Sequence, residues 1–478
     1  MANGDRDTVR LLYFFASMVP PALIALFYIG GFGRTVIFWD EWRMVGLYEK
    51  METGVLTFGD LFAQLNEHRL LFPRMILLGI EHLTQFNTTA EMYCSWAVMC
   101  AILGVAFLMW RDTFGTSGRS LLYFLPVPWL VFSLRQWENL LFGFQLVYYF
   151  FVLTVILALY FLNRTDRVSG AIAIAFAGIA SFSNLLGLLV WPAGLLLIVL
   201  NKKGKAWISA WISAALVCIV LYFYGWQRVG QPRVLYFAER PLDAAAYFTA
   251  ALGSPLGMGP WVSGLFLLSV VLGVFIGIAS IVLVVSLARS RRIPRHALWI
   301  SLLAFGFGAA LVLAAGRGGY GVDQAVSSRY VTYLLPGILA FYVLCCICHQ
   351  EKVPQLIPES LLFRGVVIVL ILGLSAGMIE GVVMGYKIRQ ERDEMSCVLL
   401  DYRNADDTHL ARLYLSPSYV RQNAAILERY RINVFFPGEE AAIRRTCESG
   451  SDPEEDFNRN VIGFRDRVNS SIHRLFPG

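Results

Sequence analysis

Long apolar runs separated by short polar segments make up most of this chain. About eleven of these runs approach the roughly 20 residues that a helix needs to cross the hydrocarbon core of a membrane. They are centred near residues 21, 100, 127, 154, 176, 193, 217, 274, 307, 340 and 375. The runs at 170–183 and 185–200 are short and interrupted by Asn184, Gly187 and Pro192. The pattern predicts an all-α polytopic membrane protein with about 11 transmembrane helices.

The first outer loop, residues 32–90, has a different pattern. Its segments "WDEWRMVGLYEKM" and "HRLLFPRMILLGIEHLTQF" alternate apolar and polar residues close to the helical period. Aromatic residues flank both segments, which is typical of helices that lie in the plane of the membrane interface. We therefore predict in-plane helices in this loop. The alternative is that both segments are amphipathic connectors that only seal the loop against lipid.

Composition agrees with a membrane protein, because 57% of the residues are hydrophobic, 15% are charged and the mean hydropathy is +0.58. The charge is concentrated near the end of the chain. From Lys387 onward 29 of 92 residues are Asp, Glu, Lys or Arg, against 45 of the 386 residues before it. We predict a transmembrane domain at 1–386 and a small soluble domain at 387–478.

Short loops on one side of the predicted helices carry most of the Lys and Arg residues, so this side faces the cytoplasm. The N-terminus lies on the same side. An odd number of spans then places the C-terminal domain outside, which in a bacterial inner membrane is the periplasm. The net charge of +6 reports this topology and does not indicate a nucleic-acid partner.

The cysteines point to one candidate disulfide and to no metal site. Cys397 and Cys447 are the two cysteines of the predicted outer domain, and that compartment is oxidising. Whether they are bonded is open on sequence alone. The "CCIC" run at 345–348 has no His or Cys partners at ligand spacing. We expect no cofactor, and a divalent cation stays an open alternative for which the sequence gives no motif.

Ionisable residues collect at the outer ends of the predicted helices, whereas the helix interiors are almost free of charge. A transporter coupled to ions usually holds ionisable groups near the middle of the membrane. The pattern therefore favours chemistry at the outer membrane surface. In the first cluster, Asp40 and Glu41 stand between Trp39 and Trp42. Two adjacent acids at this boundary cost desolvation energy, although Asp40 could also act only as a helix cap.

Further polar clusters follow on the same face. The segment "NEHRLLFPR" supplies the candidate site residues Glu67, His68 and Arg69. The turn "RQWENLLFGFQ" places an indole beside polar groups, which is how proteins hold a sugar ring, in Trp137, Glu138 and Asn139. Asn184 lies in a break between two apolar runs, which indicates a cavity that opens outward. The alternative for the aromatic residues is that they anchor the chain at the interface.

The segment "GRGGYGVDQAVSSRY", residues 316–330, is the last cluster. Its Gly-rich backbone and the two arginines Arg317 and Arg329 suit an anion, because a guanidinium binds phosphate through two hydrogen bonds. The alternative is that both arginines contact lipid headgroups without specificity.

Together these motifs resemble the GT-C superfamily of membrane glycosyltransferases. The resemblance rests on the acidic pair Asp40–Glu41 in the first outer loop, the in-plane helices, the many spans, and Arg329–Tyr330 followed by Pro336. The acidic pair looks like that of protein O-mannosyltransferases, and the whole set looks like uncharacterised bacterial proteins thought to modify surface glycans. The chain lacks a "WWDYG" motif and a second DxD, which disfavours peptide N-glycosylation.

The resemblance implies an inverting hexosyl- or pentosyltransferase that takes its sugar from a polyprenyl-phosphate carrier. The acceptor would be a glycan or lipid of the cell envelope. The resemblance also implies Asp40 as the catalytic base with Glu41 in support, and Arg329 with Arg317 at the donor phosphate. Sugar and acceptor would contact Trp39, Trp42, Glu67, His68, Arg69, Trp137, Glu138, Asn139 and Asn184.

Two alternatives stay open. A carrier or flippase for a lipid-linked sugar would need a path of polar residues through the membrane, which the sequence does not show. An O-antigen polymerase or ligase also uses lipid-linked donors at this face, but such proteins tend to concentrate arginines in a large outer loop. The sequence does not identify the sugar, the acceptor or the linkage.

Overall fold

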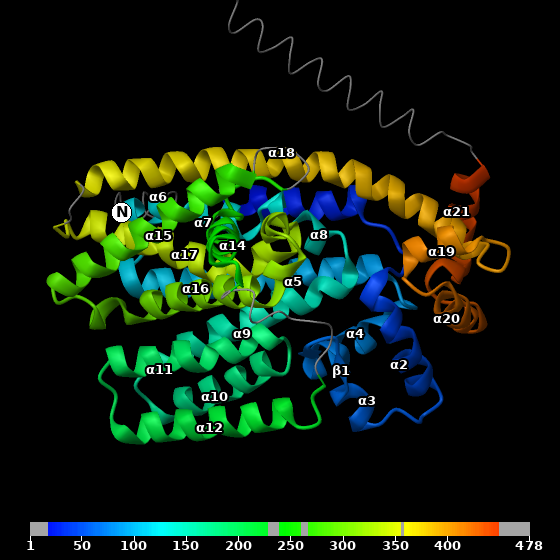
Figure 1. Ribbon diagram of the computed structural model, residues 1–478, viewed down its shortest axis with the longest axis horizontal. Helices are drawn as coiled ribbons and strands as arrows, with labels where there is room; N and C mark the ends of the chain where they lie inside the picture. The colour runs from blue at the N-terminus through cyan, green and yellow to red at the C-terminus, as the bar shows by residue number, and fades with distance from the viewer. Residues whose placement is uncertain (1–17, 228–238, 260–265, 355–357, 449–478) are drawn as a thin grey trace, which may run out of the picture.

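The computed structural model describes residues 18–227, 239–259, 266–354 and 358–448. Within these ranges the chain is almost entirely helical (Figure 1). Two short strands, β1 (Gln64–Leu65) and β2 (His68–Arg69), pair antiparallel in the first outer loop. The predicted all-α architecture is confirmed.

Seven helices of the described ranges are long and apolar enough to cross a membrane. They are α5 (Thr88–Phe114), η3 with α9 (Gly143–Leu162), α12 (Lys205–Phe223), α15 (Phe266–Arg289), η5 through α16 to η6 (Pro294–Tyr320), α17 (Ser328–Gln350) and α18 (Glu359–Leu400). Three shorter apolar helices are Met18–Phe32, α10 (Arg167–Ser181) and η4 with α11 (Leu185–Leu200). These lengths and compositions are those of a multi-pass membrane protein.

The apolar run near residue 127 does not form one long helix. It is divided into α6 (Gly118–Phe124) and α7 (Pro126–Val131), which are followed by η2 (Leu134–Gln136) and α8 (Trp137–Leu140). Pro126 begins the second piece because a proline fits the first turn of a helix but not its interior. The count of eleven crossings stays a prediction.

Helix α17 forms the centre of the bundle, since every residue of its most apolar stretch is buried. It approaches α16 (Ala297–Arg317) closely, because a Cβ on Gly306 would lie 2.4 Å from the Cα of Gly337. Small residues allow such contacts between membrane helices. Helix α14 (Pro241–Gly253) packs against α15 and α16. In Figure 1, α18 runs along one face of the bundle, and α10, α11 and α12 lie at the opposite face.

The first outer loop contains the helices that its pattern predicts. They are η1 (Trp39–Glu41), α2 (Trp42–Glu52), α3 (Phe58–Phe62) and α4 (Leu71–Thr84). Helix α3 starts with a capping box, in which the Thr57 hydroxyl accepts from the Asp60 N–H and the Asp60 carboxylate accepts from the Thr57 N–H. Their orientation in the membrane plane stays a prediction.

The C-terminal part continues directly from the last apolar helix. Helix α18 spans 42 residues and crosses the predicted domain boundary at residue 387 without a break. It is followed by α19 (Asp407–Leu413), α20 (Pro417–Tyr430), η8 (Asn433–Phe435) and α21 (Pro437–Glu448). Residues 449–478 of the predicted domain lie outside the described ranges, and the division into two domains stays a prediction.

The C-terminal helices share a hydrophobic core with the first outer loop. Leu399, Leu413 and Leu427 pack in one buried cluster with Trp42 and Tyr48. In Figure 1 both groups of helices accordingly gather at the same end of the bundle.

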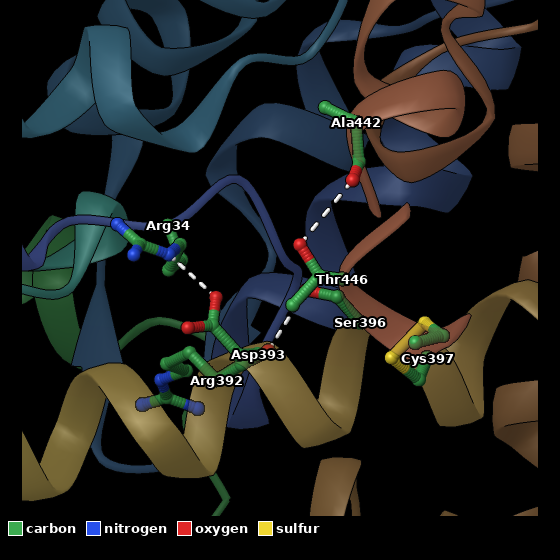
Figure 2. Close-up of a disulfide and its surroundings, with 8 residues drawn as sticks. Arg34, Arg392, Asp393, Ser396, Cys397, Ala442 and Thr446 are labelled. Carbon is green, nitrogen blue, oxygen red and sulfur yellow. Dashed lines mark hydrogen bonds and ion pairs between the residues drawn. A yellow bond between two sulfur atoms is a disulfide. The ribbon is translucent and has the colours of Figure 1, made fainter. Parts of the chain in front are cut away.

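Covalent and ionic contacts reinforce this arrangement (Figure 2). Cys397 of α18 and Cys447 of α21 form a disulfide whose Cα atoms are 5.9 Å apart. Arg34 Nε, at the start of the first loop, lies 2.5 Å from Asp393 Oδ1 of α18. The sequence left open whether Cys397 and Cys447 are bonded, and the structure shows that they are.

Candidate functional site

A cavity of about 470 Å³ lies between the first outer loop, helices α9, α16 and α17, and the link between α19 and α20. Seven of the residues singled out from the sequence line it: Trp39, Asp40, Glu67, His68, Asn184, Arg317 and Arg329. They come from four segments that are far apart in the chain. The fold therefore brings residues of four of the predicted polar clusters together at one place.

Asp40 lies in the short helix η1 and is half-buried. The preceding Trp39 has a φ of 47°, in the left-handed region that side chains other than glycine rarely adopt. The amide of Asn66 donates to both carboxylate oxygens of Asp40, at 3.3 and 3.5 Å. Backbone strain of this kind occurs at functional sites, where surrounding contacts hold it in place. Here the strained turn and the amide fix an acid at the cavity wall.

A second group combines an acid, an imidazole and a guanidinium. The backbone N–H of Leu185 donates to His68 Nδ1 at 3.2 Å, so the neutral ring carries its proton on Nε2. Nε2 lies 3.6 Å from Glu67 Oε1, and the same oxygen is paired with Arg317. Burial lowers the pKa of His68, which favours the neutral ring. Burial raises the pKa of Glu67, but the charge of Arg317 and its hydrogen bond to Glu67 favour the ionised form, and the pKa stays below the ordinary value.

The third group surrounds Arg329 at the start of α17. Its Nε lies 3.0 Å from Glu138 Oε1, and its side chain is 46% exposed. A guanidinium has five N–H donors, so this pairing leaves most of them for a ligand. Tyr333 and Tyr148 also line the cavity, and their rings stack with centroids 4.6 Å apart. The cavity thus holds two guanidinium groups beside an aromatic wall.

The cavity can bind an anionic group at its arginines and, next to it, a neutral polar group at Asp40. Arg317 and Arg329 supply positive charge, and Asp40 supplies a carboxylate that is hydrogen-bonded to an amide but is not paired with either arginine in the described residues. The described residues contain no group of three or more His, Cys, Asp or Glu side chains placed to hold a metal ion.

Comparison with known proteins gives distant structural neighbours. They include two crystal structures of ArnT from Cupriavidus metallidurans.

The apo structure of ArnT is 15% identical, covers 89% of this chain and 78% of its own, and has a TM-score of 0.43. The structure bound to undecaprenyl phosphate is 14% identical, covers 91% and 79%, and has a TM-score of 0.42. No family model and no curated protein matches this chain. At this level of similarity, a function for this chain has to come from its own residues.

Two members of the "WDEW" motif do not line the cavity. Glu41 is fully buried behind it, and its Oε2 accepts from the Phe38 N–H at 3.2 Å. Burial raises the pKa of Glu41 to about 7, with two further buried acids, Glu81 and Glu91, beside it. Trp42 is buried in the core shared with the C-terminal helices. Neighbouring side chains at a helix start point about 100° apart, which explains why Asp40 and Glu41 face different surroundings.

Arg69 and Trp137, which we expected in contact with sugar or acceptor, also lie away from the cavity. The Arg69 guanidinium donates to the carbonyl groups of Phe62, at 2.8 Å, and of Tyr222, at 2.6 Å. These bonds tie the first outer loop to the end of α12. The Trp137 indole N–H donates to the buried Glu380 of α18 at 3.3 Å. Both side chains hold helices together.

Glu138 and Asn139 reach the cavity only through Arg329. Glu138 pairs with the Arg329 side chain, and the Asn139 amide donates to the Arg329 carbonyl at 3.0 Å. Asn139 also donates to Thr332 Oγ1 at 2.7 Å. The turn that contains them therefore orients the first turn of α17.

Several cavity residues were not singled out from the sequence. Asn66 directly precedes Glu67 in the "NEHR" segment, so the polar residues beside it in the sequence were the signal that could have identified it as a cavity residue. Tyr330 was noted only as part of the Arg329–Tyr330 pair and was given no role at the site. Tyr333 lies three residues later on the same face of α17, and this spacing was the available signal for it. Trp226 and Tyr414 also line the cavity, but each lies in a segment whose local sequence gives no such signal.

Proposed function

We propose that this protein is an inverting glycosyltransferase at the outer face of the inner membrane. It moves a hexose or pentose from a polyprenyl-phosphate carrier to a hydroxyl group of a glycan or lipid in the cell envelope. The observation that carries the proposal is that Asp40 lines the same cavity as Arg317 and Arg329.

The donor phosphate binds to the two arginines. Arg329 offers a partly exposed guanidinium, and Arg317 is oriented by Glu67. Guanidinium groups bind phosphate through paired hydrogen bonds, which gives both charge and direction. Val312 and Leu313 line the cavity one turn before Arg317 on α16. They give an apolar surface to the isoprenoid chain that follows the phosphate.

Asp40 acts as the general base. The acceptor hydroxyl oxygen attacks the anomeric carbon, and the hydroxyl proton passes to the Asp40 carboxylate. The new carbon–oxygen bond forms as the bond between the anomeric carbon and the phosphate oxygen breaks. Polyprenyl phosphate leaves with the bonding electrons, and attack from the opposite side inverts the anomeric centre. The leaving phosphate is stabilised by the arginines, so one carboxylate is sufficient, in contrast to the pair that glycosidases use.

The other cavity residues contact the sugar and the acceptor in this proposal. Trp39 offers an indole ring, Asn184 an amide, and His68 the Nε2–H of its neutral imidazole. Glu41 has a structural role in this proposal, because its side chain is buried behind the cavity. By accepting from the Phe38 N–H it holds the turn that carries Asp40.

The topology in this proposal has the N-terminus in the cytoplasm and the cavity and C-terminal helices outside. The Lys and Arg residues of the short loops support it. A reporter that is active only outside the cytoplasm should be active when fused at Gly478 and inactive at Gly204. The reverse pattern would place the cavity on the wrong side for an outer-face transferase.

Transfer can be measured directly with purified protein. Undecaprenyl phosphate carrying radiolabelled glucose, galactose, mannose or arabinose is supplied with phospholipid vesicles that contain glycolipids extracted from the envelope of the source cells. We expect label to move from one of these donors to the glycolipid fraction. A protein that transports the labelled donor across a bilayer without breaking the bond to phosphate would be a flippase, and the proposal would be wrong.

A further inference from the structure

The C-terminal helices supply part of the cavity wall. Tyr414 and Leu415, in the link between α19 and α20, line the cavity together with Trp39 and Asp40. Tyr414 is half-buried, whereas 73% of Leu415 is exposed. The link therefore stands at the boundary between the cavity and its surroundings. A segment from the far end of the chain thus reaches the same cavity as the proposed catalytic base.

Tyr414 is coupled to the turn that carries Asp40. The guanidinium of Arg43 lies over the rings of Tyr414 and Tyr419, with its Cζ 5.9 and 5.3 Å from the ring centroids. The Tyr419 hydroxyl donates to the carbonyl of Trp42 at 3.4 Å. Arg43 follows Asp40 by three residues, so the cation that holds the tyrosine and the proposed base lie within one helical turn. Cation–π contacts of this kind fix an aromatic ring in position.

The segment that carries Tyr414 is itself firmly attached. The disulfide joins Cys447 to α18, and the side-chain amide of Asn433 donates to the Phe86 carbonyl at 2.8 Å. Arg429 Nη1 lies 2.8 Å from Glu49 Oε1 of α2. Contacts to α18, to α2 and to the end of α4 therefore hold the C-terminal helices against the first outer loop. Tyr414 is part of a fixed wall.

The cavity has two chemically different sides. Arg317 and Arg329 come from the apolar helices α16 and α17, whereas Tyr414 comes from the charge-rich C-terminal part. Asp40 interacts electrostatically both with Arg43, which holds Tyr414, and with His68, which is grouped with Arg317. The base thus stands between the cationic side and the tyrosine side.

We infer that Tyr414 is a binding residue for the saccharide acceptor. Its ring offers an apolar face against which a sugar ring stacks, and its hydroxyl can bond to the rim of that sugar. The acceptor enters past the C-terminal helices and presents its hydroxyl to Asp40, while the lipid-linked donor occupies the side of the arginines. This inference rests on the proposed function.

The test separates acceptor binding from donor binding. Initial rates are measured with the labelled undecaprenyl-phosphate donor and with the glycolipid vesicles described above, each varied in turn. We expect Tyr414→Ala and Tyr414→Leu to raise the apparent KM for vesicle glycolipid about tenfold and to leave the KM for the donor unchanged. Tyr414→Phe keeps the ring, so its acceptor KM should stay within about twofold of wild type.

Tyr430→Ala is the matched control, because Tyr430 lies in the same segment at the end of α20 and does not line the cavity. Leucine keeps apolar volume at position 414, and an intact disulfide in that variant verifies the fold of the C-terminal helices. Unchanged acceptor KM in Tyr414→Leu, or an equal rise in donor KM, would overturn the inference while the proposed function stands. Absence of transfer by the wild-type protein would overturn both.

Discussion

Glu41 and Glu91 place two carboxyl groups beside each other in the protein interior, and neither side chain is exposed. Glu81 is the third buried acid of this cluster. Within the described residues, both side-chain oxygens of Glu81 lack a hydrogen-bond partner. Neighbouring carboxyl groups in a low-dielectric environment do not all ionise. The turn that carries Asp40 therefore rests on a group that changes charge with pH.

The first prediction concerns stability as a function of pH. A glutamate ionises near pH 4.5 in the unfolded chain, whereas burial raises the pKa of Glu41 to about 7 in the folded protein. Between these values the folded protein keeps a proton that the unfolded chain has released. The free energy of unfolding therefore falls as pH rises from about 4.5 through 7. Glu41→Gln mimics the protonated acid, so its Tm at pH 8 should exceed that of wild type by a few degrees and should match it at pH 5.

Thermal unfolding in detergent micelles at both pH values measures this difference. Glu391→Gln on α18 is the control, because that glutamate is 44% exposed and its replacement should leave the pH dependence unchanged. Equal losses of Tm between pH 5 and pH 8 in wild type and Glu41→Gln would show that Glu41 does not titrate on its own in this range.

The second prediction concerns the general base. Asp40→Asn keeps the size of the side chain and an oxygen that can accept from Asn66, but the amide does not accept a proton. We expect a folded protein in which transfer is reduced by at least about a hundredfold, since general-base catalysis contributes about 10²–10⁴-fold. The measurement is single-turnover transfer from the labelled donor.

Asp323→Asn serves as the matched control for this variant, because Asp323 is an exposed acid near the same face and does not line the cavity. Near-wild-type turnover by purified Asp40→Asn would show that Asp40 is not the general base and would leave it with its contact to Asn66.

The third prediction concerns the phosphate. Arg329→Ala should weaken binding of undecaprenyl phosphate at least tenfold, and Arg329→Lys should recover part of the loss, because lysine keeps the charge but not the planar fork. Quenching of tryptophan fluorescence during titration reports the Kd, since Trp39 and Trp226 line the cavity.

Arg240→Ala is the control for this titration, because Arg240 is 69% exposed and pairs with Asp243 outside the cavity. Identical titration curves for Arg329→Ala and wild type would reassign Arg329 to contacts with bulk lipid headgroups.

The fourth prediction concerns the disulfide. The chain has eight cysteines, of which six are free in the structure. Thiol labelling of the denatured, unreduced protein should therefore modify six. Closing a loop of about 50 residues contributes about 4 kcal/mol to the stability of the folded segment. Reduction should accordingly expose α19 to α21 to proteolysis at temperatures where the oxidised protein resists it. Labelling of eight thiols would contradict the bond.

Hydropathy predicted the apolar helices well because a membrane-crossing helix is defined by its own composition. The same reasoning placed Asp40, Arg317 and Arg329 at one membrane face, and the fold brings them to one cavity. The sequence did not show that the Glu41 side chain points into the protein interior. The direction of each side chain in an acidic pair depends on the residue at which the helix starts. The local sequence does not predict that Arg69 donates to carbonyl groups of Phe62 and Tyr222, because partners far apart in the chain leave no local pattern. No local pattern marks Tyr414 as a cavity residue, because the fold brings it there from the far end of the chain.

Helix α18 links the apolar bundle to the cavity wall as one rigid rod. At 1.5 Å per residue its 42 residues extend about 63 Å, roughly twice the hydrocarbon thickness of a bilayer. Long apolar helices adjust to a thinner or thicker bilayer by changing their tilt. A tilt of a few degrees displaces the far end of such a rod by several ångströms. The helices that carry Tyr414 are attached both to that end and to the first outer loop, so a change in the tilt of α18 would act on both of these walls of the cavity together.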